Sequence, residues 1–164
     1  MAKRVIEPFQ KQHHSRENFS CEVESLQQYF RTQASQDLRK KAAAVFVLAE
    51  GAAVLGYYTL SSYAIDAGDL PPDTARPAIL IGRLARDQTY RGQRIGETLL
   101  MDALHRCLEN TATAGAIAVV VEAENEKARS FYLEYGFIAF PEHQNKLFIT
   151  MQSVKAMFAA RNGW

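Results

Sequence analysis

The sequence predicts an α+β fold with one mixed sheet. Strand-like runs come first, a strand–helix–strand–helix unit follows, and the chain closes on a hairpin, which is the element order of a mixed sheet. The 164 residues are 48% hydrophobic and 23% charged, a composition typical of a globular chain with a sizeable core. Because no internal repeat interrupts this order, we expect a single domain over residues 1–164.

The first half of the chain predicts one helix and an antiparallel hairpin. Apolar side chains recur at helical spacing within residues 21–41, at Val23, Leu26, Tyr29 and Phe30. The apolar runs 42–50 and 53–65 are typical of strands, and Glu50–Gly51 between them predicts a tight turn. Residues 67–77 are rich in Gly and Pro and predict a loop.

The second half predicts a parallel strand–helix–strand unit. The strand 78–87 leads into a helix from 94 to about 110, and the strand 116–123 follows. This connection places the strand at Ile79 beside the strand at Ile117 and parallel to it. Gly82 inside the first strand is typical of a bulge or a close backbone approach.

A second helix and a closing hairpin complete the predicted fold. The helix covers 125–135, with Asn125 as its N-cap and Gly136 as its C-terminal stop. Residues 137–140 and 146–151 predict the two strands of the hairpin. For residues 152–164 the sequence predicts no particular element.

Charge and cysteine usage exclude several classes of protein. The net charge is only +1, so a general nucleic-acid-binding domain is excluded, although residues 1–41 carry eight Lys and Arg against five Asp and Glu and leave room for a local basic face. Cys21 and Cys107 have no CxxC spacing and the four histidines no metal-like spacing, so we expect neither a disulfide framework nor a metal. With no apolar span or secretory signal, we expect a cytoplasmic protein without a membrane partner.

The turn in residues 83–100, RLARDQTYRGQRIGETLL, predicts an anion site. The first N–H groups of the helix have no partner within it, and the helix dipole adds partial positive charge there. Arg91 and Arg94 add full charges, and Gly92 lets the backbone approach a ligand. A phosphate or pyrophosphate fits, and a solvated helix start is the alternative. The Walker and GxGxxG patterns are both excluded.

This stretch resembles the pyrophosphate loop of the Gcn5-related N-acetyltransferase (GNAT) family, with the pattern (Q/R)-x-x-G-x-(G/A). Arg91, Ile95 and Gly96 match, and Arg94 stands where the family has Gly. The segment VEAENEKARSFYLEYGF resembles the second cofactor element of the same family, through Asn125, Ala128, Phe131, Tyr132, Gly136 and Phe137. The resemblance implies the GNAT fold: a mostly antiparallel central sheet with a splayed parallel βαβ unit that binds acetyl-CoA.

The resemblance also implies roles for particular residues. Tyr132 is the expected general acid, because a phenol titrates near pH 10 and keeps its proton at neutral pH; a plain core position is the alternative. A backbone N–H near Leu84 or Ala85 is expected to face the acetyl carbonyl. The residues expected to bind the cofactor are Leu84, Ala85, Arg91, Gly92, Gln93, Arg94, Ile95, Gly96, Glu97, Asn125 and Ala128.

Several segments, among them CEVESLQQYFRTQASQD, VLGYYTLS and GRLARD, together resemble the acetyltransferase toxins of type II toxin–antitoxin modules. That likeness implies acetylation of the α-amine of aminoacyl-tRNA, a ribbon–helix–helix antitoxin and a homodimer. Basic residues are needed along the path of the tRNA. The candidates are Arg39, Lys40, Lys41 and Arg83, with Lys3 and Arg4 as further ones; the 39–41 run is equally well explained as a helix C-terminus.

No acidic residue stands out as a general base, although Glu122 and Glu124 flank a strand end. An α-amino group titrates near 8 and a lysine near 10.4. An α-amine on an ester titrates lower still, because the ester withdraws charge, so it arrives largely as the free nucleophile. The absence of an obvious base therefore favours an aminoacyl ester. Two alternatives stay open: acetylation of a small-molecule or protein amine, and a non-catalytic module that binds coenzyme A.

Overall fold

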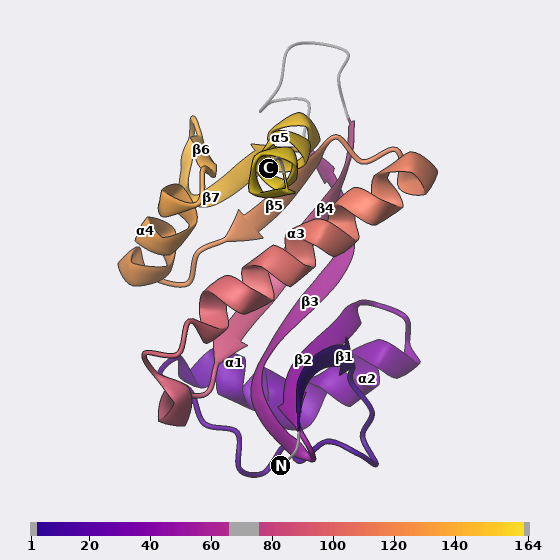
Figure 1. Ribbon diagram of the computed structural model, residues 1–164, viewed down its shortest axis with the longest axis vertical. Helices are drawn as coiled ribbons and strands as arrows, with labels where there is room; N and C mark the ends of the chain where they lie inside the picture. The colour runs from indigo at the N-terminus through magenta and orange to yellow at the C-terminus, as the bar shows by residue number, and fades with distance from the viewer. Residues whose placement is uncertain (1–2, 66–75, 163–164) are drawn as a thin grey trace. The chain divides into compact units, whose positions relative to one another are not determined.

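The computed structural model describes residues 3–65 and 76–162 (Figure 1). These residues fall into two compact units, one of residues 3–61 and 82–103, and the other of residues 62–65, 76–81 and 104–162. The single domain expected from the sequence stays a prediction. Most of the predicted loop over 67–77 lies outside the described residues, and its last two positions belong to a strand.

Within the described residues, the strands form one seven-stranded sheet in the order β1-β2-β3-β4-β5-β7-β6. Four of the strand pairs are antiparallel: β1–β2, β2–β3, β5–β7 and β6–β7. The pair β4–β5 is parallel. The predicted mixed sheet is thereby confirmed. The strands are β1 (Arg4–Pro8), β2 (Ala44–Glu50), β3 (Ala53–Ile65), β4 (Arg76–Arg86), β5 (Ala118–Glu122), β6 (Ile138–Phe140) and β7 (His143–Thr150).

The parallel pair follows the prediction closely. Ile79 pairs with Val119, and the recorded pairing of β4 with β5 ends at Ile81 and Val121, while β4 itself runs on to Arg86. Beyond Ile81, the backbone of β4 therefore has no recorded ladder pairing with β5. Such a segment keeps polar backbone groups for another partner.

In the first unit, the predicted helix over 21–41 is present but interrupted. It consists of α1 (Glu24–Gln28), a π-helical turn η1 (Tyr29–Gln33) and α2 (Ala34–Arg39). Leu26, Tyr29 and Phe30 are buried, as the helical spacing predicted, and they pack on Tyr57 of β3 and Phe19. The sequence pattern predicted neither the π-helical turn nor the edge strand β1.

Helix α3 (Ile95–Ala114) packs its first turns closely on β3. A Cβ atom on Gly56 would lie 2.7 Å from Leu99 Cδ1 and 2.8 Å from the Ala85 carbonyl oxygen. A real Cβ does not tolerate these distances, so the absent side chain sets how near α3 comes to the sheet. The sequence suggested a close approach at Gly82, which stays a prediction, whereas the structure places one at Gly56.

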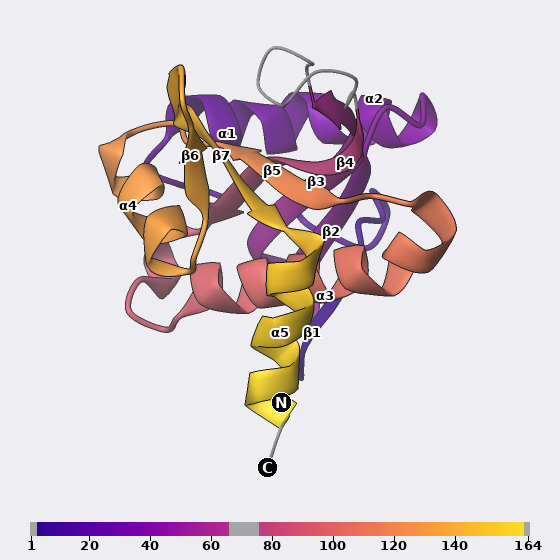
Figure 2. The same cartoon turned by 90° about the horizontal axis from the view of Figure 1, so that it is seen from above.

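The second unit confirms the predicted closing elements. Helix α4 (Glu126–Glu134) begins after Asn125, whose Oδ1 accepts a hydrogen bond of 2.9 Å from the Ala128 N–H. Gly136, two residues beyond the end of the helix, has φ +94°. Figure 2 shows β6, β7 and β5 side by side. The C-terminal residues, for which the sequence predicted no element, form helix α5 (Met151–Asn162).

Substituting Gly56 with Ala tests the packing of α3. We expect Gly56→Ala to lower the free energy of unfolding by about 1–3 kcal/mol, because the added methyl overpacks the contact with Leu99 and a carbonyl oxygen that cannot rotate away. Urea denaturation measures the loss. Gly51→Ala is the control. Gly51 lies in the exposed hairpin turn at φ +64°, so an alanine there strains the backbone and creates no close packing contact. A loss at Gly56 no larger than at Gly51 would contradict this packing.

Candidate functional site

The turn that leads from β4 into α3 is held in place by a buried carboxylate. Asp87 is 3% exposed, and its side-chain oxygens accept hydrogen bonds from the backbone N–H groups of Thr89, at 2.8 Å, and Ser20, at 3.0 Å. The Gln88 N–H in turn donates a hydrogen bond of 2.8 Å to the Ser20 carbonyl. The start of the loop is therefore fixed to a segment 67 residues earlier in the chain.

Two residues with left-handed backbone turn the chain into α3. Gly92 has φ +84° and Arg94 has φ +57°. Arg94 stands where the family pattern has Gly, and it adopts the conformation that glycine reaches without strain, at a cost of about 1–2 kcal/mol. Its carbonyl accepts the Thr98 N–H at 3.1 Å, so Arg94 directly precedes the helix, which begins at Ile95.

The start of α3 meets the requirements of an anion site. Ile95 is buried and anchors the first turn, whereas Arg94 is exposed with its guanidinium 3.8 Å from the Glu97 carboxylate. The opening N–H groups of the helix and its dipole favour negative charge here. An added Cβ at Gly92 would meet no atom within 4 Å, so the backbone at that position is open to a ligand.

Three arginines surround this turn, and two of them share one carboxylate. Glu22, from the segment before α1, pairs with Arg91 and lies 3.5 Å from Arg86. Arg4 of β1 donates to the Gln93 side-chain carbonyl at 2.7 Å. Arg91 therefore binds a carboxylate through Nη2, and its guanidinium has further N–H donors that can meet a second anion.

Tyr132 on α4 differs from the other buried tyrosines. Tyr29, Tyr57 and Tyr58 donate their hydroxyl protons to Asp37, to the Leu26 carbonyl and to Asp102, respectively. The Tyr132 ring is 5% exposed and packs against Phe131 and Phe137, but within the described chain its hydroxyl has no recorded partner.

The hydroxyl of Tyr132 is nevertheless not sealed from solvent, because no fully buried side-chain oxygen among the described residues lacks a partner. Burial raises the pKa of Tyr132 above its usual value, and the charge of Glu124 raises that pKa further. Glu124 and Glu122, the two acidic residues at the end of β5, are both exposed. At neutral pH Tyr132 is therefore a protonated donor whose solvent-accessible hydroxyl has no recorded acceptor among the described residues.

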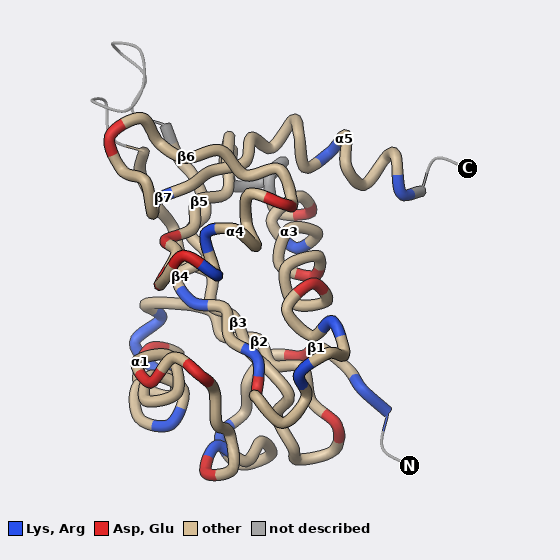
Figure 3. The backbone as a smooth tube through the Cα atoms, turned by 90° about the vertical axis from the view of Figure 1, so that its left-hand side faces the viewer, with Lys and Arg blue, Asp and Glu red and all other residues tan. Residues whose placement is uncertain are grey.

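The basic candidates for nucleic-acid contact lie in the first unit. Arg39, Lys40 and Lys41 end α2 and are exposed, with Lys41 at φ +58°. Acidic and basic residues are interspersed around α1 (Figure 3). Arg83 on β4 is half-buried and lies over the Tyr29 ring. Lysines and arginines at the end of α2 are also explained by the helix dipole.

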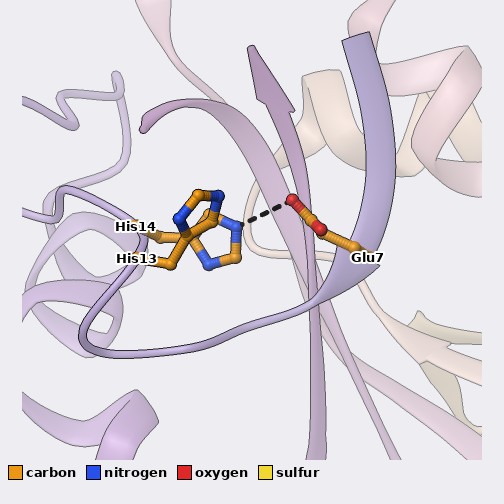
Figure 4. Close-up of side chains that lie close together, drawn as sticks. All are labelled: Glu7, His13 and His14. Carbon is orange, nitrogen blue, oxygen red and sulfur yellow. Dashed lines mark hydrogen bonds and ion pairs between the residues drawn. The ribbon is translucent and has the colours of Figure 1, made fainter. Parts of the chain in front are cut away.

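One cluster of possible metal ligands occurs among the described residues: Glu7, His13 and His14, with ligand atoms within 4.8 Å of one another (Figure 4). Nδ1 of the buried His14 accepts the Gln10 N–H at 3.0 Å, and its Nε2 lies 3.1 Å from Glu7. Neutral His14 therefore carries its proton on Nε2 and donates it to Glu7. This tautomer offers no Nε2 lone pair to a metal, which favours a structural role.

The predicted site residues fall into two groups. Leu84, Ala85 and the loop from Arg91 to Glu97 belong to the first unit, with Arg83 and Arg39–Lys41. Asn125, Ala128 and Tyr132 are on α4 or at its start, in the second unit. Sequence reasoning did not identify the supporting residues Ser20, Glu22, Arg4, Gly56 and Asp87. Of these residues, only Asp87 could have been found from the local sequence. An Asp in a turn commonly accepts the backbone N–H of the residue two positions later, which here is Thr89.

A pyrophosphate-type turn at the start of α3 and a capped helix ending in Gly-Phe are the two elements by which acetyl-CoA-dependent acetyltransferases are recognised. The chain belongs to the acetyltransferase (GNAT) family, which matches residues 9–137. Among the residues that the structure describes, no helix is both long enough and apolar enough to cross a membrane.

Within this family, the chain is similar to toxins. It is 30% identical to a probable toxin TacT of Sinorhizobium fredii over 95% of this chain and 96% of that protein. It is 31% identical to a tRNA-acetylating toxin of Mycobacterium tuberculosis over 85% of this chain and 88% of that protein.

Solved structures of the toxin AtaT have the same fold. AtaT complexed with acetyl-methionyl-tRNAfMet has a TM-score of 0.87 and 30% identity, covering 95% of this chain and 99% of that one. A tyrosine-to-phenylalanine mutant of AtaT, bound to the C-terminus of its antitoxin AtaR and to acetyl-CoA, also has a TM-score of 0.87 and 30% identity, covering 96% of this chain and 99% of that one.

The left-handed residue before α3 gives the first prediction for the site. We expect Arg94→Gly to raise the free energy of unfolding by about 0.5–1 kcal/mol, because relief of backbone strain exceeds the added entropy of the unfolded chain. Arg94→Ala, which removes the charge and keeps the strained backbone, is the matched control. Urea denaturation compares the three proteins. Destabilisation by Arg94→Gly would contradict the left-handed conformation.

Proposed function

We propose that this protein transfers the acetyl group of acetyl-CoA to the α-amine of an aminoacyl-tRNA and so acts as a toxin that inhibits translation. An acetylated α-amine is no longer a nucleophile for peptide transfer. The observation that carries the proposal is the left-handed turn into α3, which the family uses for the coenzyme diphosphate, in a chain similar to tRNA-acetylating toxins. Because charged tRNA is found in the cytoplasm, the protein acts there.

The loop from Arg91 to Glu97 holds the diphosphate of the cofactor. Open backbone at Gly92, the unpaired N–H groups at the start of α3 and the exposed Arg94 supply donors and positive charge. Asp87 keeps the loop in shape before the ligand arrives, so little ordering is needed on binding. Asn125 and Ala128, which form the cap of α4, belong to the second cofactor element.

The backbone of β4 near Leu84 and Ala85 stabilises the carbonyl oxygen of the thioester. Its N–H donors are held in place by the strand, and fixed donors stabilise the developing oxyanion without reorganisation. The amine nitrogen then forms a bond to the carbonyl carbon, the C–S bond breaks, and an amide and a thiolate result. The amine loses one proton, and the thiolate takes one up.

Tyr132 supplies the proton to the thiolate. Its hydroxyl is the only one, among the four buried tyrosines compared above, without a recorded acceptor, and its raised pKa keeps it protonated at neutral pH. The phenolate is then reprotonated from solvent. Because an α-amine on an ester is largely unprotonated near neutral pH, no base on the protein is needed.

A toxin of this class requires a partner that suppresses it. We assign that role to a ribbon–helix–helix antitoxin and expect the free toxin to be a homodimer. Co-purification with the product of a neighbouring small gene tests the first assignment. Light scattering of the free protein tests the second.

The activity itself is tested with purified protein, a set of charged tRNAs and radiolabelled acetyl-CoA. Label should enter the aminoacyl end of at least one tRNA and be released with the amino acid on deacylation. A protein lysine peptide and a polyamine are the control acceptors. Label in these acceptors and none in tRNA would overturn the proposed substrate.

The role of Tyr132 predicts the result of one substitution. We expect Tyr132→Phe to fold normally and bind acetyl-CoA with unchanged affinity, but to lose at least 100-fold in kcat, since proton transfer contributes about 10²–10⁴-fold. Tyr135→Phe, on the next turn, is the matched control and should stay active. Stopped assays measure kcat, and calorimetry measures the affinity for acetyl-CoA. Near-normal turnover of Tyr132→Phe would refute the assignment.

The raised pKa of Tyr132 predicts a pH profile. We expect kcat/KM to rise as the substrate α-amine loses its proton, near pH 8 or below, and to stay high up to pH 10, where an ordinary tyrosine would begin to lose its proton. Initial rates corrected for ester hydrolysis give the profile. A fall below pH 9 would be inconsistent with a buried tyrosine as the acid.

A further inference from the structure

Arg83 is held flat against a buried aromatic ring. Its guanidinium carbon lies 3.7 Å from the centre of the Tyr29 ring, which is van der Waals contact. Tyr29 is 5% exposed, and the backbone N–H of Arg83 donates to the Thr59 hydroxyl at 3.1 Å. A guanidinium stacked in this way loses little further freedom when it binds a ligand.

The ring beneath Arg83 is itself fixed. The Tyr29 hydroxyl donates to Asp37 Oδ2 at 2.6 Å, eight residues along the chain. In an uninterrupted α-helix, residues eight apart differ by about 80° around the axis, from 3.6 residues per turn. The π-helical turn at Tyr29–Gln33 takes up about one extra residue, so Asp37 comes onto the face of Tyr29. The π-helical turn thus makes this bond possible.

The charge of Arg83 is not neutralised by this arrangement. Arg4, Arg86, Arg91 and Arg94 each have a carboxylate within 4 Å, but within the described parts of the chain no ion pair is recorded for Arg83. Stacking on Tyr29 leaves the N–H donors of the guanidinium in one plane. A planar fork of donors suits the paired oxygens of a phosphodiester.

The position of Arg83 on β4 indicates which phosphodiester fits. Arg83 and Ala85 are two apart on one strand, so they share a face and lie about 6.6 Å apart at 3.3 Å per residue. The strand near Ala85 is the proposed place of the acetyl carbonyl. In an aminoacyl-tRNA the anion nearest to the reacting amine is the phosphodiester of the terminal adenosine, one ribose away from the ester.

We infer that Arg83, positioned by Tyr29 and Asp37, binds the phosphodiester of the terminal nucleotide and thereby selects an amine carried on tRNA over a free amino-acid ester. The inference rests on the proposed function. Arg83 is the contact residue, and Tyr29 and Asp37 are positioning residues.

The test compares charged tRNA with the methyl ester of the same amino acid, which has the reacting amine and no phosphate. For Arg83→Ala we expect KM for charged tRNA to rise about 10–100-fold, the value of one hydrogen bond to a charged group. The slope of log kcat/KM against log salt should flatten by about one. Turnover of the methyl ester and the affinity for acetyl-CoA should stay within about twofold.

Further variants separate the contact from the fold. Arg83→Lys keeps the charge and loses the planar fork, so we expect an intermediate KM for charged tRNA. Tyr29→Phe keeps the ring and loses the bond to Asp37, so we expect a smaller rise in the same KM. Arg16→Ala removes another arginine over an aromatic ring, 5.8 Å from Phe9, and should change neither substrate.

The outcomes distinguish two kinds of failure. If wild-type protein acetylates the methyl ester but no charged tRNA, the proposed function fails and the inference with it. If wild-type protein acetylates charged tRNA and Arg83→Ala leaves its KM and salt slope unchanged, or impairs both substrates equally, only the inference is overturned. A KM effect confined to charged tRNA supports it.

Discussion

The backbone conformation between β4 and α3 is the constraint on which the site depends. Gly92 and Arg94 both take left-handed φ values, and this turn leads directly into the first N–H groups of α3, which have no partner within the helix. The conformation is held from outside the loop. Asp87 ties its start to Ser20, and Gly56 lets α3 settle against the sheet. A strained arginine in place of glycine is tolerated because these surrounding contacts over-determine the turn.

Buried tyrosines show how the same side chain serves stability and chemistry. Where a hydroxyl has an acceptor, as in Tyr29, Tyr57 and Tyr58, the ring fills the core and the oxygen is satisfied. Tyr132 keeps the buried ring without the acceptor. A buried tyrosine hydroxyl usually finds a partner within the protein, whereas the hydroxyl of Tyr132 is reached by solvent and is left able to donate a hydrogen bond there.

Local patterns in the sequence predicted most of the elements. The hairpin from Ala44 to Ile65, the cap at Asn125 and the parallel pairing of Ile79 all depend on neighbouring residues or on one crossover connection, and all were predicted. The contacts that support the loop were not, because they join residues 67 to 89 positions apart, such as Ser20 with Asp87 and Arg4 with Gln93. No periodicity encodes such pairs. The catalytic role of Tyr132 came from motif resemblance, whereas an anion site in the loop followed from the helix start and its two arginines.

The pairing of Glu22 with Arg91 and Arg86 has a consequence for how the cofactor is taken up. Glu22 is an internal anion beside the place proposed for the diphosphate, and its single negative charge offsets one of the two positive charges of Arg86 and Arg91. The loop therefore keeps part of its positive charge for the cofactor, while the repulsion between the two guanidinium groups is already reduced before the cofactor binds.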